Sequence, residues 1–134
     1  MTAGYSKTPL VKKLGIKEGF RIEIVNPPED YDKLIGEYPD GVEKVSQGTD
    51  LDFVHIFTNS FGELESLMIN YKDRIKKNGT IWFSWYKKAS KLPSEITEDY
   101  VRNTALSLGL VDVKVCAVDE KWSGLKIVIR KENR

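Results

Sequence analysis

The sequence is poor in the residues that most nucleophilic and metal sites need. It has one cysteine and one histidine in 134 residues. A lone cysteine, Cys116, cannot form an internal disulfide, and the two residues give no metal-ligand spacing. His55 lies between Val54 and Ile56 in an apolar run, where a satisfied core histidine is expected rather than a general base. We therefore expect no catalytic residue and no metal residue, and we expect Cys116 to be a small core residue.

A marked excess of charge is also absent. The 21 Lys and Arg residues face 20 Asp and Glu residues, so no nucleic acid and no membrane surface is expected as a partner. No apolar run could span a bilayer, and the first residues do not look like a signal peptide. Together with the single cysteine, this predicts a cytoplasmic protein. Residues 1–134 are expected to form one domain, since domains commonly contain ~100–150 residues.

A glycine-rich turn is missing after the first predicted strand. Residues 20–26 are rich in β-branched side chains, and Pro27 and Pro28 follow them directly. Cofactor-binding turns of α/β domains use glycines, which let the backbone approach the ligand and donate N–H groups to it. Proline has no N–H and fixes φ at about −65°. The usual cofactor site of such a domain is therefore expected to be lost.

Hydrophobic patterning nevertheless predicts an α/β chain. Further strands are expected at 42–45, 51–58, 80–86, 111–118 and 124–130, and helices at 9–14, 30–35, 62–77 and 98–108. The last two strands are joined by a loop too short for a crossover helix, so they must be antiparallel, with the reversed strand at one edge. The longer connections make the other main strands parallel. The predicted fold is a three-layer, Rossmann-like sheet, mostly parallel with a C-terminal antiparallel hairpin.

Local signals set the ends of the predicted helices. Thr8 and Pro9 predict the start of the first helix. Ser60 and Glu63 have the spacing of a capping box at the start of the helix expected at 62–77. Residues 76–79, Lys-Lys-Asn-Gly, are typical of a helix C-terminus and are expected to end it.

The order of these elements from Asp50 to Arg130 resembles the C-terminal half of the class I, S-adenosylmethionine-dependent methyltransferase fold, which ends in the same antiparallel hairpin. Nearly the whole chain also resembles a bacterial domain-of-unknown-function family, numbered three thousand and fifty-two. That second resemblance is carried by residues 3–6, 85–90, 111–119 and 122–126. It implies no established activity.

The chain departs from methyltransferases where they hold the cofactor. Their loop after the first strand is glycine-rich, and an acidic strand end further on holds the cofactor ribose. Here Pro27 and Pro28 stand in the loop, and neither Glu29 nor Glu43 matches the position of the acidic residue. The resemblance, read with these departures, implies that the chain has no cofactor and that S-adenosylmethionine is unlikely to bind.

The candidate ligand site is predicted at one edge of the sheet, because crevices in parallel sheets lie outside the carboxyl ends of the strands. Basic and aromatic residues at 85–91 could hold a phosphate, a carboxylate or a flat ligand, although a solvated basic loop is the alternative. Trp122, expected in a short loop, would cover a core edge, a ligand or another subunit. The candidate ligand-binding residues are Asn26, Thr58, Asn59, Trp85, Lys87, Lys88, Trp122 and Ser123. Polar loops that merely follow strand ends are the alternative for the whole set.

Three functions remain open from the sequence. The first is a non-catalytic binding module for a small anionic ligand or a protein partner. The others are an atypical S-adenosylmethionine-dependent methyltransferase and a structural subunit of a larger assembly. For the first function, a bound anion is expected to contact Lys87 or Lys88, together with Trp85 or the loop at Trp122 and Ser123.

Overall fold

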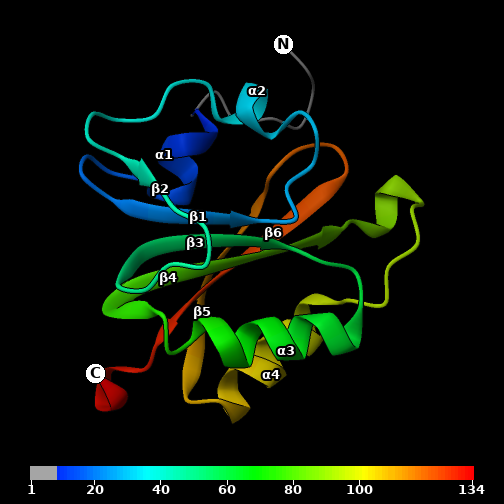
Figure 1. Ribbon diagram of the computed structural model, residues 1–134. Helices are drawn as coiled ribbons and strands as arrows, with labels where there is room; N and C mark the ends of the chain where they lie inside the picture. Colours follow the sequence, from blue (N-terminus) through cyan, green and yellow to red (C-terminus); the bar gives the residue numbers. More distant parts are fainter. Residues whose placement is uncertain (1–8) are drawn as a thin grey trace.

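A six-stranded sheet organises residues 9–134, the part of the chain that the computed structural model describes (Figure 1). The strand order is β2-β1-β3-β4-β6-β5. The strands are β1 (Arg21–Val25), β2 (Glu43–Lys44), β3 (Leu51–Phe57), β4 (Ile75–Tyr86), β5 (Leu110–Ala117) and β6 (Trp122–Ile129). Strands β1 to β4 pair in parallel, whereas β6 is antiparallel to both β4 and β5. The predicted mostly parallel sheet with a C-terminal antiparallel hairpin is confirmed.

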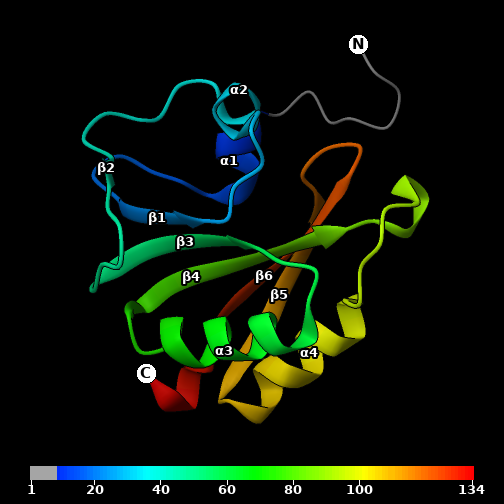
Figure 2. The ribbon, with the colours of Figure 1, turned by 45° about the vertical axis from the view of Figure 1, so that its right-hand side comes forward.

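Helices cover both faces of this sheet. Helices α1 (Leu10–Leu14) and α2 (Tyr31–Ile35) lie on one face, and α3 (Phe61–Tyr71) and α4 (Glu98–Ser107) lie on the other (Figure 2). Short 3-10 turns, η1 and η2, occupy Lys88–Ser90 and Lys131–Asn133. Each face has its own buried apolar cluster, as expected for strands covered on both sides. The three-layer arrangement is therefore also as predicted.

Side-chain caps mark the starts of α3 and α4, and the cap at Ser60 is as predicted. The Ser60 hydroxyl accepts a hydrogen bond from the Glu63 N–H at 3.5 Å, and the Thr97 hydroxyl accepts one from the Tyr100 N–H at 3.1 Å. These bonds satisfy N–H groups that a helix cannot pair internally. The cap predicted at Thr8 lies outside the described residues, but Pro9, predicted as the first helical residue, is instead the N-cap of α1.

The predicted end of α3 is wrong. The helix stops at Tyr71, and residues 76–79 belong to β4. Leu51 of β3 lies opposite Ile75 of β4, but the next pair is Phe53 with Thr80. Strand β4 therefore carries extra residues in an irregular segment between these two pairs. A Cβ atom on Gly79 would lie 2.8 Å from the Leu51 carbonyl oxygen, so this close approach requires glycine. The Lys-Lys-Asn-Gly signal thus marks a β-bulge, because pairing with β3 overrides the local helix-end preference.

The predicted position of the reversed strand is also wrong. Strand β6 lies between β4 and β5, and β5 forms the edge. The connection through α4 places β5 one strand position away from β4, and β6 occupies the position between them. Leu125 and Ile127 of β6 are consequently almost fully buried, whereas Val113 and Val115 of β5 are exposed. A short loop fixes the antiparallel direction of the pair but not which strand is inside.

Substitution of Gly79 by alanine should destabilise the protein by about 1–3 kcal/mol, because the new methyl group meets backbone that cannot rotate away. Urea unfolding followed by circular dichroism measures this change. Gly62→Ala is the matched control, since a Cβ atom there meets nothing within 4 Å and alanine favours the helix. Equal stability of the two variants would contradict the proposed bulge geometry.

Candidate functional site

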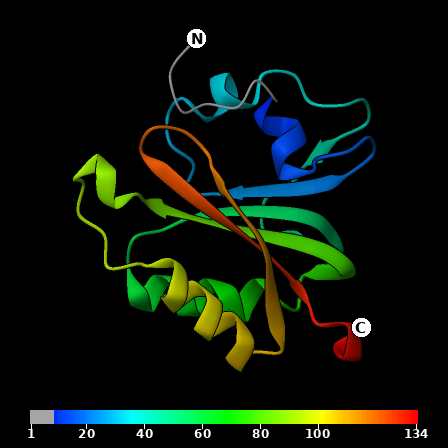
Figure 3. The same cartoon turned by 180° about the vertical axis from the view of Figure 1, so that it is seen from behind.

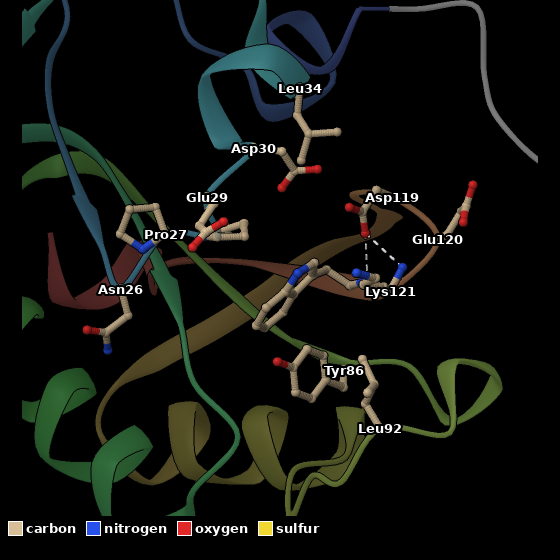
Figure 4. A pocket seen from close by; sticks show the side chains of 12 residues that line it. Asn26, Pro27, Glu29, Asp30, Leu34, Tyr86, Leu92, Asp119, Glu120 and Lys121 are labelled. Carbon is tan, nitrogen blue, oxygen red and sulfur yellow. Dashed lines mark hydrogen bonds between the residues drawn. The ribbon is translucent and has the colours of Figure 1, made fainter.

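An open cleft of about 870 Å³ lies at the carboxyl ends of β1 and β4 (Figure 4). The loop between β1 and α2 borders it on one side, and the loop between β5 and β6 borders it on the other. Its lining residues are Asn26, Pro27, Pro28, Glu29, Asp30, Leu34, Tyr86, Leu92, Asp119, Glu120, Lys121 and Trp122. This is the sheet edge at which the sequence places the ligand site.

The loop after β1 is fixed by its own hydrogen bonds. Asn26 adopts a left-handed φ of 54°, which asparagine tolerates better than most residues. Its side-chain amide donates to the Phe57 carbonyl at 3.3 Å, tying the loop to the end of β3. The Tyr31 N–H donates to the Pro28 carbonyl at 3.0 Å. Since neither Pro27 nor Pro28 has an N–H, this wall of the cleft offers few backbone donors to a ligand.

The opposite loop is shaped by Asp119. One oxygen of its carboxylate accepts the N–H groups of Lys121 at 2.8 Å and of Trp122 at 2.9 Å, as Figure 4 shows. Trp122 is buried. Its ring packs edge-on against Phe57, with the ring centroids 4.8 Å apart, and at a tilt against Tyr86, with the centroids 4.4 Å apart. Of the roles considered for Trp122, covering a core edge is the one seen, and its ring also contributes to the cleft lining.

The charges around this cleft are mainly negative, and we call it the acidic cleft. Four carboxylates, from Glu29, Asp30, Asp119 and Glu120, face one ammonium group, from Lys121. Such a lining attracts a cation and repels an anion. The cleft therefore suits a positively charged ligand better than the small anion expected from the sequence.

The predicted basic residues line a different cleft, of about 500 Å³. It brings together Trp85, Lys87, Lys88 and Ser123, and it belongs to the side of the sheet that α4 covers. Acidic side chains at positions 98 and 99 also line this cleft, but both form ion pairs with Arg102. The structure thus divides the predicted site between two clefts. Anion binding at Lys87 and Lys88 stays a prediction.

Two predicted site residues, Thr58 and Asn59, line neither cleft and connect strands instead. The Asn59 side-chain oxygen accepts the Tyr86 N–H at 2.8 Å, and its carbonyl accepts the Glu95 N–H at 2.9 Å. The buried Thr58 donates its N–H to the Ser84 carbonyl at 3.0 Å.

Several residues of the larger cleft were not predicted as site residues, although they lie in the same loops or at the same strand end. They are Pro27, Pro28, Glu29, Asp30, Leu34, Tyr86, Leu92, Asp119, Glu120 and Lys121. The strand-end rule that selected Asn26 and Trp122 applies equally to most of them.

The histidine is a core residue, as predicted, whereas Cys116 is only half-buried and packs against the margin of the α1-side cluster. His55 is fully buried and hydrogen-bonds the Tyr31 hydroxyl at 2.9 Å and the Ser84 hydroxyl at 2.8 Å. Burial lowers the pKa of His55 to about 3. Burial raises the pKa of the half-buried Cys116 thiol.

Within residues 9–134, no three His, Cys, Asp or Glu side chains are grouped so as to hold a metal ion. None of the helices in this range has the length and apolar character needed to cross a membrane.

Comparison with known proteins identifies the fold. No family model and no curated protein matches the sequence, so the resemblance to the domain-of-unknown-function family stays a prediction. Solved structures do match. An S-adenosylmethionine-dependent methyltransferase from Aquifex aeolicus is 19% identical, with a TM-score of 0.64, over 90% of this chain and 88% of that chain. A putative type 11 methyltransferase from Sulfolobus solfataricus is 15% identical, with a TM-score of 0.64, over 91% and 90% of the two chains. The chain therefore has the class I methyltransferase-like fold.

The expectation that the chain has no cofactor and that S-adenosylmethionine is unlikely to bind is corrected by these comparisons. A further similar structure, fibrillarin from Aeropyrum pernix, was solved with natively bound S-adenosylmethionine. It is 12% identical, with a TM-score of 0.58, over 93% of this chain and 70% of that chain. Pro27 and Pro28 do not close this edge of the sheet, because they line an open cleft there.

The pKa of His55 predicts a pH-dependent stability. The folded protein holds the ring neutral down to about pH 3, whereas the unfolded chain protonates it below about pH 6.5. Since the unfolded state then binds more protons, stability falls as pH falls from about 6.5 toward 3. Between pH 7 and pH 5, His55 should account for a loss of about 2 kcal/mol.

Urea unfolding measures the free energy of unfolding of wild type and of His55→Gln at pH 7 and at pH 5. The difference between the two proteins in their change with pH is the contribution of His55, because the effects of most other titrating groups are the same in both. Glutamine keeps a donor and an acceptor for Tyr31 and Ser84 but does not titrate. Equal pH dependence in the two proteins would show that His55 is not held neutral in the fold.

Proposed function

We propose that the chain binds S-adenosylmethionine in the acidic cleft and acts as an atypical S-adenosylmethionine-dependent methyltransferase. One observation carries this proposal: an open cleft with acidic and aromatic lining lies at the carboxyl ends of β1 and β4, on a methyltransferase-like sheet. Its volume of about 870 Å³ is within the range of ~300–1,000 Å³ common for small-molecule sites.

The lining fits the charge of this cofactor. A sulfonium and an ammonium group make two positive charges, against one carboxylate. Glu29 and Asp30 border the cleft from one side and Asp119 and Glu120 from the other, so carboxylates surround the space. The ring of Tyr86 adds an aromatic face that can stack on adenine or attract a cation.

The chain would hold the cofactor differently from proteins with a glycine-rich loop. Pro27 and Pro28 cannot donate N–H groups to the cofactor carboxylate. The groups that remain are the Lys121 ammonium for that carboxylate, and the Glu29 and Asp30 carboxylates for hydroxyl or ammonium groups. Binding through side chains in place of backbone is what makes the proposed site atypical.

The bound cofactor would supply an electrophilic methyl group. The protein's own contribution would be orientation and charge, which account for much of the catalysis in group transfer. Trp122 and Tyr86 would exclude water from the floor of the cleft, and the carboxylates would keep the cationic ligand in place. A non-catalytic module for a small anion is less favoured in this cleft, because its carboxylates repel anions.

Calorimetric titration tests the charge argument directly. Wild type should bind S-adenosylmethionine with micromolar affinity and S-adenosylhomocysteine, whose sulfur is neutral, more weakly. The double variant Glu29→Gln with Asp30→Asn should lose about tenfold in affinity for the charged ligand, or about 1.4 kcal/mol. It should also lose most of the preference between the two ligands.

Glu18→Gln is the matched control, since Glu18 is exposed in the turn before β1, at the opposite end of that strand. It should bind like wild type. No binding of S-adenosylmethionine by wild type at millimolar concentration would overturn the proposal. Equal losses in the control and the double variant would show that the effect is one of overall charge.

A further inference from the structure

A second charged surface lies on the β5–β6 hairpin, away from the acidic cleft. Lys114 of β5 and Lys126 of β6 are direct cross-strand partners in the antiparallel ladder. Two positions further along, the partners are Cys116 and Gly124, which face the α1 side of the sheet. Side chains two apart on a strand share a face, so both lysines also face the α1 side. Like charges placed opposite each other destabilise a strand pair unless an anion lies between them.

A β-bulge turns the Asp112 carboxylate away from the sheet face on which Lys114 and Lys126 lie. In a regular strand Asp112 would share the face of Lys114, because the two residues are two apart. The ladder is irregular between these residues, and Asp112 instead accepts a hydrogen bond from Arg102 of α4 at 3.0 Å. The lysine pair is therefore left without its neighbouring acid.

A third ammonium group contacts the same hairpin. Lys13 of α1 reaches over and donates to the Ala117 carbonyl at 3.0 Å. The charges of Lys13 and Lys114 both act on the Cys116 thiol, opposing the rise in its pKa that burial causes. Among the described residues, Lys13, Lys114 and Lys126 form no ion pair with a carboxylate.

The surface is accessible. Lys114 is exposed and Lys126 is half-buried. Figure 3 shows β5 and β6 nearest the viewer, with no helix drawn in front of them.

We propose that Lys114 and Lys126 form a binding site for a phosphate-type oxyanion, with Lys13 adding to the positive charge of the hairpin. The shared chemistry is a tetrahedral, doubly charged oxyanion, supplied either as free phosphate or by a phosphorylated small molecule. Two ammonium groups on adjacent strands supply up to six N–H donors to such a group. Its binding removes the repulsion between the lysines and so stabilises the fold. The site is independent of the proposed methyltransferase function.

Thermal unfolding in increasing inorganic phosphate, at ionic strength held constant with chloride, tests the site. The melting temperature of wild type should rise with phosphate and follow a binding curve. Lys114→Gln with Lys126→Gln should weaken the apparent affinity at least about tenfold, and without phosphate it should melt no lower than wild type. Lys17→Gln, an exposed lysine in the turn before β1, is the control and should respond like wild type.

Lys114→Glu gives a second test that does not depend on loss of structure. It creates a cross-strand ion pair with Lys126, so the melting temperature without phosphate should rise and the response to phosphate should disappear. Repeating the titration with O-phosphoserine distinguishes the sources: a tighter response indicates a phosphorylated ligand, and an equal or weaker one indicates free phosphate. Absence of a saturable response in wild type, or its persistence in the double variant, would overturn the proposal.

Discussion

Burial of β3 on both faces and along both edges is the constraint on which the rest of the structure depends. Its apolar residues are almost completely buried, and it pairs in parallel with β1 on one side and β4 on the other. Parallel neighbours need crossover connections, and burial on two faces needs helices on both sides. These requirements bring the carboxyl ends of β1, β3 and β4 to one edge. The acidic cleft lies at that edge, between the loop that follows β1 and the loop that joins β5 to β6.

A short row of buried polar groups links this central strand to the wall of the cleft. His55 of β3 bonds Ser84 of β4 on one side and Tyr31 of α2 on the other. Tyr31 is the first residue of α2, directly after the loop that carries Glu29 and Asp30. The row therefore sets where α2 begins, and with it the position of two cleft carboxylates. Buried hydrogen bonds of this kind are costly to break, because each unpaired group would lose water without gaining a partner.

Features that depend on local chemistry could be predicted from the sequence. The main strands, the cap at Ser60 and the antiparallel direction of the last pair all follow from residues close together in the chain. Features that depend on distant partners could not. The bulge at Gly79 requires the Leu51 carbonyl, and the inner position of β6 depends on how far the α4 crossover reaches.

The candidate site shows the same division. The strand-end rule located the correct edge of the sheet, but side-chain direction alternates along β4 and sends Trp85 and Tyr86 toward different apolar clusters. One predicted site therefore became two clefts. The acidic character of the larger cleft arises only when the β1–α2 loop and the β5–β6 loop face each other, and they are about ninety positions apart in the chain.

The paired prolines beside this cleft also bear on the entropy of ligand binding. Each proline holds its φ angle near one value in the unfolded chain as well as in the folded one, so ordering Pro27 and Pro28 forfeits less backbone freedom than ordering glycines would. A glycine-rich loop can close around its ligand but loses that freedom when it does. A ligand of the proposed site would therefore meet a wall with little backbone freedom left to lose, and its affinity would depend on how well its shape matches that wall.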